Sequence, residues 1–371
     1  MSKKKIIWIT ADHFIDVDLP IIPYLVTYYD ITWLIVESGS NTIDYHRIIE
    51  DKIHGLPIKI EYIKIRSRIR NIKIIFEYIS LFRRVKNQRV DLIYFDFDGF
   101  PYFNFFFYKF FNQKKTIVAI HNVSTPKGAV NYSLAKRYTN FTLSKFKNIQ
   151  VFSLSQLSVL NEKFKNKNVL YAPLALKDFG KSSLKPNEKI TFLCFGLIRE
   201  YKRVDVLINA AQKAYEETKK TFLVKIAGNC NHWEKYQKLI KYDFLFDLRI
   251  DRVPNEDIPD LFAYSHYFVL PYQDIAQSGA LTVGLNYNLP VIVSELPAFK
   301  EFVMDKETGF FMKIADVESL KNIIVHVLMN HDEIYSTLKN NQQKFVEENL
   351  SLESIIEKYR NYFNQLIYER Y

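Results

Sequence analysis

The chain alternates short apolar runs, bounded by polar or turn-forming residues, with longer stretches in which apolar residues recur at helical spacing. This alternation is typical of a parallel β-sheet covered by helices. In the first half, the runs that predict strands are residues 5–10, 31–37, 58–65, 90–97, 115–121 and 148–155. In the second half they are residues 189–196, 221–228, 248–253, 267–272 and 290–294. The pattern therefore predicts two doubly wound α/β halves.

A polar segment, LALKDFGKSSLKPNEK at residues 174–189, interrupts the alternation, and we place the domain boundary in it. We expect an N-terminal Rossmann-like domain at residues 1–175 and a second one at residues 176–350. Residues 351–371 predict a terminal helix, because their apolar residues recur at helical spacing. Two doubly wound halves imply a cleft faced by the carboxyl ends of their strands.

Amino-acid composition and net charge limit the kinds of protein that this chain can be. Of the 371 residues, 48% are hydrophobic and 25% charged, which is typical of a folded, soluble protein. A net charge of +10 favours an anionic partner: nucleic acid, phospholipid or a phosphorylated small molecule. Cys194 and Cys230 lack metal-ligand spacing, so neither a zinc site nor a disulfide framework is expected. The first apolar run is too short for a signal peptide, and a cytoplasmic protein is expected.

Two segments predict a binding site at strand ends. Small residues, Ser278 to Ala280, follow the run at 267–272, and a helix start with small side chains lets an anion reach its free N–H groups. Arg199 and Lys202 lie on the turn after the run at 189–196. Taken alone, the small residues are explained better by a tight turn than by a ligand, and a solvated basic turn explains the two cations as well as a ligand does.

Four segments in order along residues 190–328 together resemble the donor half of the retaining glycosyltransferases of family 4. They are FGLIREYKRVDVLI, VKIAGN, DIPDLFAYSHYFVLPYQDIAQSGALTVGLNYNLPVIVSELPAFKEFV and ETGFFMKIADVESLKNII. The first half resembles the family loosely, through KTIVAIHNV and QVFSLSQ. The resemblance implies the GT-B fold: two Rossmann-like doubly wound domains facing a cleft, with a C-terminal helix that packs back on the first domain.

The resemblance also assigns roles to residues. Lys202 matches the lysine that holds the donor phosphate, and Arg199 substitutes for an arginine that usually stands at the position of Leu197. The backbone of Ser278, Gly279 and Ala280 matches a turn that cradles the same diphosphate. Cations fixed there would stabilise the charge that grows on the leaving phosphate. In the first half, His121 matches a histidine near the reacting carbon of the sugar.

The sequence departs from the family at two positions. The family commonly has two glutamates eight residues apart, and Ile275 and Val283 stand in their places. Neither can bind a hydroxyl through a carboxylate. We consider Asp274, Gln277 and Thr282 as alternative contacts to the sugar or nucleotide.

Two acidic triplets, Asp16-Val17-Asp18 and Asp96-Phe97-Asp98, resemble metal-binding motifs of a different glycosyltransferase fold. Such triplets are common by chance, and cations already occupy the expected phosphate site. We predict a reaction that needs neither a metal nor another cofactor.

Between Lys64 and Arg89 the chain has nine basic residues and one acidic residue, Glu77, with apolar residues interleaved. Two interpretations remain open: a basic amphipathic helix on an anionic membrane, or a solvated helix packed on the sheet. The aromatic run at 102–111 favours core over a groove for an acceptor lipid.

The sequence thus predicts a hexosyltransferase-type enzyme that uses a nucleotide-sugar donor, UDP-sugar before GDP-sugar. The acceptor is expected to be a growing, lipid-linked glycan, as in capsular, O-antigen or exopolysaccharide synthesis. Peripheral binding to the inner face of the cell membrane is part of this hypothesis. The alternatives are a catalytically silent relative that binds the donor and a basic lipid- or nucleic-acid-binding scaffold. Nucleic acid is disfavoured because the aromatic residues concentrate in apolar runs.

Overall fold

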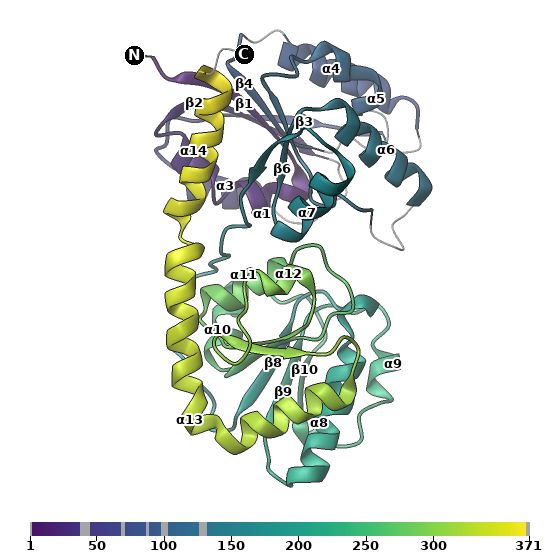
Figure 1. Ribbon diagram of the computed structural model, residues 1–371, viewed down its shortest axis with the longest axis vertical. Coiled ribbons are helices and arrows are strands. Elements are labelled where there is room, and N and C mark those ends of the chain that lie inside the picture. The colour runs from purple at the N-terminus through teal and green to yellow at the C-terminus, as the bar shows by residue number, and fades with distance from the viewer. Residues whose placement is uncertain are drawn as a thin grey trace. The chain divides into compact units, whose positions relative to one another are not determined.

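The computed structural model describes residues 2–37, 45–67, 71–86, 89–97, 103–125 and 132–368. The chain divides into two compact units, each with its own sheet (Figure 1). The first unit contains the residues up to Ala175 and those from Leu352 onward, and the second is Leu176–Ser351. The chain therefore returns to the first unit through its last helix.

The first unit is built on a parallel seven-stranded sheet with the order β3-β2-β1-β4-β5-β6-β7. Its strands are β1 (Lys4–Ala11), β2 (Tyr29–Glu37), β3 (Lys59–Lys64), β4 (Leu92–Asp96), β5 (Thr116–Ala119), β6 (Asn148–Val151) and β7 (Asn168–Tyr171). In chain order, β2 and β3 are added on one side of β1, and β4 to β7 are then added on its other side. The topological switch point, where ligands of such sheets bind, therefore lies between β1 and β4.

Helices cover both faces of this sheet. On one face lie α1 (Ile15–Asp18), α2 (Ile22–Leu25), α3 (Tyr45–Ile53) and α14 (Leu352–Tyr368), while Phe14 of η1 (Asp12–Phe14), which follows β1, packs with the cluster of the other face. On the other lie α4 (Ile74–Lys86), α5 (Phe103–Phe107), η2 (Tyr108–Phe110), α6 (Tyr132–Lys145) and α7 (Leu154–Lys163). Alternate residues of the strands supply the two cores, because successive side chains of a strand point to opposite faces.

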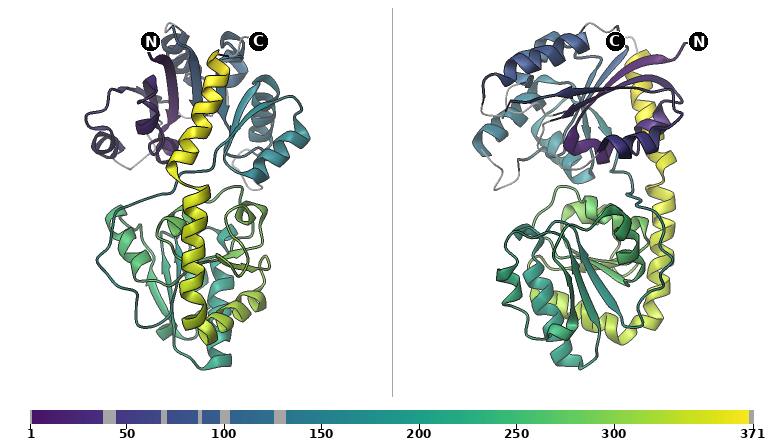
Figure 2. Two further views of the ribbon diagram at one scale, coloured as in Figure 1. Left: turned by 60° about the vertical axis from the view of Figure 1, so that its left-hand side comes forward. Right: turned by 180° about the vertical axis from the view of Figure 1, so that it is seen from behind.

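The C-terminal helix α14 is part of the first core, as the resemblance implied. It lies across the sheet of the first unit (Figure 2) and buries Tyr359 and Phe363 against Trp8 and Tyr94. The buried amide of Gln150 links the two layers: it accepts from the Tyr94 hydroxyl (2.5 Å) and donates to the Tyr359 hydroxyl (2.6 Å). Without this helix, a buried apolar face would be open to water.

The second unit has a parallel six-stranded sheet with the order β10-β9-β8-β11-β12-β13. Its strands are β8 (Thr191–Phe195), β9 (Leu223–Ala227), β10 (Phe246–Arg249), β11 (Tyr267–Leu270), β12 (Val291–Ser294) and β13 (Gly309–Met312). The chain runs outward from β8 through β9 to β10, then crosses back to β11. The switch point of this unit therefore lies between β8 and β11.

Two helical layers enclose this second sheet. One contains α8 (Val204–Thr218), α9 (Glu234–Gln237), η4 (Asp243–Leu245) and the start of α13 (Val317–Asn349). The other contains α10 (Ile258–Ala263), α11 (Gly279–Asn286) and α12 (Pro297–Lys300). The short helices η3 (Glu200–Lys202) and η5 (Asn255–Asp257) lie in the turns before α8 and α10.

The predicted pair of doubly wound halves is confirmed, with errors in single elements. β7 and β13, each a four-residue strand at the edge of its sheet, were not predicted. The run at 248–253 is misplaced, since the strand ends at Arg249 and Val253 packs beneath α10 instead.

The basic stretch from Lys64 to Arg89 is not one helix. Lys64 ends β3 and pairs in register with Glu37, and α4 begins only at Ile74. Arg68, Ile69 and Arg70 lie outside the described residues. No helix in the described ranges has both the length and the apolar content of a membrane span.

Candidate active site

Two glycines shape the turn that follows β8. Gly196 has a φ of 104°, and Gly228, at the end of the neighbouring β9, has a φ of 144°. A Cβ atom on Gly228 would lie 2.3 Å from the Gly196 carbonyl oxygen, and one on Gly196 would lie 3.3 Å from the Nζ of Lys202. The two strand ends can approach one another only because both residues lack a side chain.

Lys202 is a buried cation at this turn. It is the last residue of η3 and is only 8% exposed. Its Nζ lies 5.3 Å from the centroid of the Tyr272 ring, an arrangement that permits a cation–π interaction. No carboxylate or hydrogen-bond acceptor among the described residues pairs with this Nζ. Lysine is seldom buried without a partner, so the arrangement favours an anionic ligand.

The groups around Lys202 do not supply a negative charge. Burial raises the pKa of the Cys194 thiol to about 11 and that of the Tyr272 hydroxyl well above its ordinary range. Both groups are therefore neutral near pH 7. Burial, with a further contribution from the charge of Arg199, lowers the pKa of Lys202. An anion at this turn would relieve both effects.

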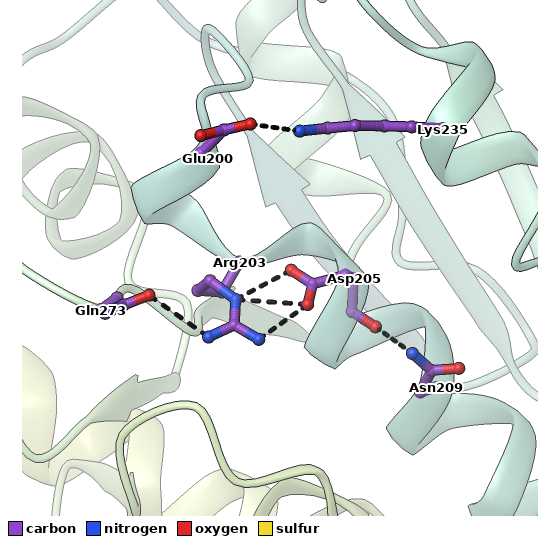
Figure 3. Close-up of polar contacts among 6 residues, drawn as sticks. All are labelled: Glu200, Arg203, Asp205, Asn209, Lys235 and Gln273. Carbon is purple, nitrogen blue, oxygen red and sulfur yellow. Dashed lines mark hydrogen bonds and ion pairs between the residues drawn. The ribbon is translucent and has the colours of Figure 1, made fainter.

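The turn is fastened to the segment after β11. The backbone N–H of Gln273 donates to the Tyr201 carbonyl oxygen at 2.6 Å, and the Arg203 guanidinium donates to the Gln273 side chain at 3.3 Å. Arg203 also donates to both carboxylate oxygens of Asp205, at 2.8 to 3.2 Å (Figure 3). The charge of Arg203 is thereby balanced within the protein. Arg199, in contrast, is exposed at the start of η3.

Contacts of η3 and of the residues before it with the segment that follows β9 further fix this turn. The carboxylate of Glu200 pairs with Lys235 at 2.7 Å, as Figure 3 shows. The backbone N–H of Ile198 donates to the Asn229 carbonyl oxygen at 2.9 Å. The exposed Arg199 therefore extends from a backbone that is held on both sides.

The small residues predicted from the sequence form the start of α11. Ser278 is the N-cap, and its hydroxyl oxygen accepts from the backbone N–H of Leu281 at 3.1 Å. Gly279 and Ala280 begin the helix, where N–H groups have no partner within it. A Cβ on Gly279 would lie 3.3 Å from the Nζ of Lys177, a cation that sequence reasoning missed. β8 and β11 are adjacent and parallel, so this helix start and the Lys202 turn lie at the same edge of the sheet.

The alternative contact residues differ in exposure. Asp274 is exposed and Gln277 is half-buried. Thr282 is 8% exposed and its hydroxyl donates to the Gly279 carbonyl oxygen at 2.8 Å. Val283 is 3% exposed and Ile275 is partly buried, and both pack in the same apolar cluster. Where the resemblance implies glutamates, the chain has apolar packing.

His121 lies at the carboxyl edge of the first sheet. Its Nε2 lies 2.8 Å from an oxygen of the buried Asp96, at the end of β4. The imidazole is stacked between Phe14 (centroid distance 3.8 Å) and Phe152 (4.5 Å). Its side chain is 10% exposed. The ring is therefore fixed in position and orientation by three neighbours.

Asp18 is a second buried carboxyl at this switch point. It accepts a hydrogen bond of 2.6 Å from the Thr10 hydroxyl, which itself accepts one from the Trp33 indole. Burial, and then the charge of Asp96, raise the pKa of Asp18 well above its ordinary value. Asp98, of the second acidic triplet, lies outside the described residues. Within the described ranges no three His, Cys, Asp or Glu side chains are grouped as metal ligands would be.

The structure thus brings together Arg199, Lys202 and the start of α11 in the second unit, and His121 with Asp96 in the first. Sequence reasoning missed Asp96 as the partner of His121, and Tyr272 and the two glycines around Lys202. The glycines had a visible signal, since each directly follows a predicted strand. Contacts between residues on different strands, such as that of Asp96 with His121, had no visible signal in the sequence.

Two doubly wound parallel units, one with an unpaired cation at its switch point, have the architecture of the GT-B glycosyltransferases. Residues 177–345 match the family model described as Glycosyl transferases group 1. The second unit is therefore similar to the domain of the group 1 glycosyltransferases.

Solved structures support the fold over the whole chain. A glycosyltransferase from Rickettsia africae ESF-5 is similar with a TM-score of 0.78 and 15% identity, covering 100% of both chains. Anabaena Alr3699/HepE, solved in complex with UDP and glucose, has a TM-score of 0.73 and 11% identity and covers 96% of this chain and 98% of its own. Sucrose-phosphate synthase from Thermosynechococcus elongatus has a TM-score of 0.74 and 13% identity, with 98% and 99% covered. A search of curated protein sequences gave no match.

Proposed function

We propose that the protein transfers a hexose from a nucleoside diphosphate donor, UDP-sugar before GDP-sugar, to a growing lipid-linked glycan with retention of anomeric configuration. The observation that carries the proposal is the buried, unpaired ammonium of Lys202 at the switch point of the second sheet. Similar structures hold this class of ligand: Alr3699/HepE was solved with UDP-glucose, and the pneumococcal O-GlcNAc transferase GtfA with UDP and GlcNAc.

In this proposal, the donor diphosphate lies between Lys202 and the start of α11. Lys202 and Arg199 contact phosphate oxygens, and the N–H groups of Ser278, Gly279 and Ala280 donate to them from below. When the bond between the sugar and the phosphate breaks, negative charge develops on the leaving diphosphate. Donors that are already in place stabilise this charge without reorganisation. Asp274, Gln277 and Thr282 are the candidates for the remaining contacts to ribose or sugar.

His121 has the complementary role, on the sugar. A ring held between two phenylalanines keeps one orientation, and its bond to Asp96 fixes which nitrogen faces the carboxylate. We assign His121 to orienting the sugar, with Asp96 as its positioning residue.

Calorimetric titration with UDP, GDP, ADP and uridine tests the donor site. Lys202→Ala and Arg199→Ala should each weaken UDP binding, Lys202→Ala by about 100-fold or more, which corresponds to the ~2.7–4 kcal/mol of a lost oxyanion contact. Uridine binding should change little. Lys241→Ala, which removes an exposed lysine of the same unit, is the control. UDP binding by Lys202→Ala at parental strength would refute the phosphate site.

A catalytically silent protein that binds the donor is the second candidate, and Ile275 and Val283 are the observation that favours it. Both proteins would bind UDP-sugar, but only the enzyme would release UDP from it. Slow hydrolysis of UDP-sugars in the absence of acceptor, followed by detection of free UDP, separates the two. Tight donor binding with no UDP released from any UDP- or GDP-hexose would favour the silent protein.

A further inference from the structure

The outer surface of three helices in the first unit is unusual in its exposed apolar side chains. α4, α5 with η2, and α6 lie together on one face of the seven-stranded sheet (Figure 1). Ile72, just before α4, is 70% exposed, and Phe76 within it is 69% exposed. Phe106 and Phe110 are 52% and 56% exposed, although the sequence predicted this aromatic run to be core. We call the outer surface of these helices the basic aromatic face.

Aromatic contacts join the helices that carry the basic aromatic face. Phe110 packs on Phe82 of α4 with ring centroids 5.1 Å apart, which joins η2 to α4. Phe105 packs on Phe141 with centroids 4.7 Å apart, which joins α5 to α6. Several large apolar side chains exposed on helices that pack together indicate an interaction site.

The charge of this face has one sign. The described segments 71–86, 103–115 and 132–147 contain a single acidic residue, Glu77, whose carboxylate accepts hydrogen bonds from Arg66 and Ser67. The same segments contain eleven basic residues: Lys73, Arg83, Arg84, Lys86, Lys109, Lys114, Lys115, Lys136, Arg137, Lys145 and Lys147. Arg84 is engaged by Glu61 at 2.5 Å. The other exposed cations of α4 and η2 have no carboxylate partner among the described residues.

Lysines lie over the aromatic rings of this face. The Nζ of Lys86 is 5.6 Å from the ring centroids of both Phe82 and Phe110, and that of Lys145 is 5.7 Å from Tyr108. In this arrangement the methylene stem covers apolar surface while the ammonium stays in water. It is the arrangement expected where apolar side chains enter a bilayer and cations remain at the level of its headgroups.

We propose that the basic aromatic face binds an anionic lipid bilayer. Ile72, Phe76, Phe106 and Phe110 enter the boundary between headgroups and acyl chains, and the cations Lys73, Arg83, Lys86 and Lys109 contact acidic headgroups. The evidence for membrane binding does not depend on the proposed function. Its biological purpose does, because membrane binding would bring the enzyme to the proposed lipid-linked acceptor. Nucleic acid fits less well, since Ile72 and the exposed Leu134 of α6 offer no surface for stacking bases.

Sedimentation of the full chain with phosphatidylglycerol vesicles and with phosphatidylcholine vesicles tests the proposal. We expect binding to the anionic vesicles only, weakened by salt. Each cation near the surface contributes ~1 kcal/mol, or about fivefold in the partition coefficient. Replacement of Lys73, Arg83, Lys86 and Lys109 by Gln should therefore reduce binding more than tenfold. Ile72→Ser, Phe76→Ser and Phe110→Ser combined should reduce it at least tenfold while leaving the charge unchanged.

Matched variants of the second unit control for charge and hydropathy. Gln at the exposed Lys181, Lys185, Lys238 and Lys241 removes the same charge from another surface. Ser at the exposed Leu184, Phe244 and Met329 removes comparable apolar area. Both control variants should bind vesicles like the parent. Equal losses in the control and the test variants would overturn the assignment to this face.

Other outcomes have distinct meanings. Failure of the parent protein to bind phosphatidylglycerol vesicles at low salt would overturn the inference, and so would a preference for single-stranded RNA over these vesicles in competition. UDP binding is measured on the same samples. Vesicle binding without UDP binding would refute the proposed function and leave this inference intact, and the reverse result would do the opposite.

Discussion

The two switch points of this molecule share a topology and differ in chemistry. At the second, glycines and small residues surround a cation that has no counterion among the described residues. At the first, buried carboxyl groups and stacked rings surround a histidine whose partner is supplied. The comparison shows that the parallel sheet provides only the position of a site. The residues at the strand ends decide whether the site attracts an anion or fixes the orientation of an imidazole ring.

Burial favours the neutral form of the ionisable group at both switch points, but the two groups have different neighbours. It raises the pKa of Asp18 and lowers the pKa of Lys202, because a low-dielectric environment disfavours the charged form of either group. One oxygen of Asp18 accepts a hydrogen bond from the Thr10 hydroxyl. Lys202 has the face of Tyr272 as its neighbour and remains open to an anion.

The largest effect is expected from Gly228→Ala, which tests whether the second switch point depends on close backbone approach. The new Cβ would meet the Gly196 carbonyl oxygen at 2.3 Å, at a φ of 144° that L-residues rarely adopt. We expect a loss of more than about 3 kcal/mol in the free energy of unfolding, measured by urea denaturation. Gly180→Ala is the control, since its φ is also positive but nothing lies within 4 Å. A similar loss in both variants would attribute the effect to φ alone.

His121→Ala should separate the two switch points functionally. We expect turnover to fall about 100-fold, in the range of a single positioned catalytic group, with UDP affinity unchanged because the proposed nucleotide site lies in the second unit. Asp96→Asn should give a smaller loss and an altered pH profile of turnover. His46→Ala, at an exposed histidine of the same unit, is the control. Unchanged turnover in His121→Ala would remove this residue from the site.

Asp18→Asn tests the neutral state of the first switch point. A carboxyl whose folded pKa is raised binds its proton more tightly in the folded than in the unfolded state. Its stabilising contribution is therefore complete below the unfolded pKa near 4 and is lost as pH rises toward the folded pKa. The variant should lack this loss, so its Tm relative to the parent should increase as the pH rises above the unfolded pKa. Asp30→Asn, at an exposed site, should show no such trend.

The smallest effect is expected from Lys202→Met, which removes the buried charge and keeps the length of the side chain. The ligand-free protein should become more stable by about 1 kcal/mol, as is common when a functional site is neutralised. Thermal unfolding with and without UDP measures both consequences, because UDP should no longer raise the Tm of the variant. A fall in Tm would indicate that Lys202 has an internal partner and a structural role.

The site was predictable where the chemistry lies within one segment. Arg199 and Lys202 follow a clear strand run, and Ser278 to Ala280 follow another, so the rule for parallel sheets places both at the same edge. The exposed aromatic residues show the limit of this reasoning. Phe103 and Phe110 belong to one run, yet Phe103 is fully buried and Phe110 is 56% exposed. Which face of a short helix meets the sheet depends on its neighbours.

The sequence by itself determined the two α/β halves, the boundary near residue 175 and the cationic turn, because these depend on local periodicity and on residue types that are adjacent in the chain. Only the tertiary structure decided that Asp96 is the partner of His121, that Gly228 makes room for Gly196, and that Lys202 is buried without an anion. Each of these relations joins separate strands. They arise when the sheet assembles, because burial and partnership are properties of the packed chain rather than of any segment of it.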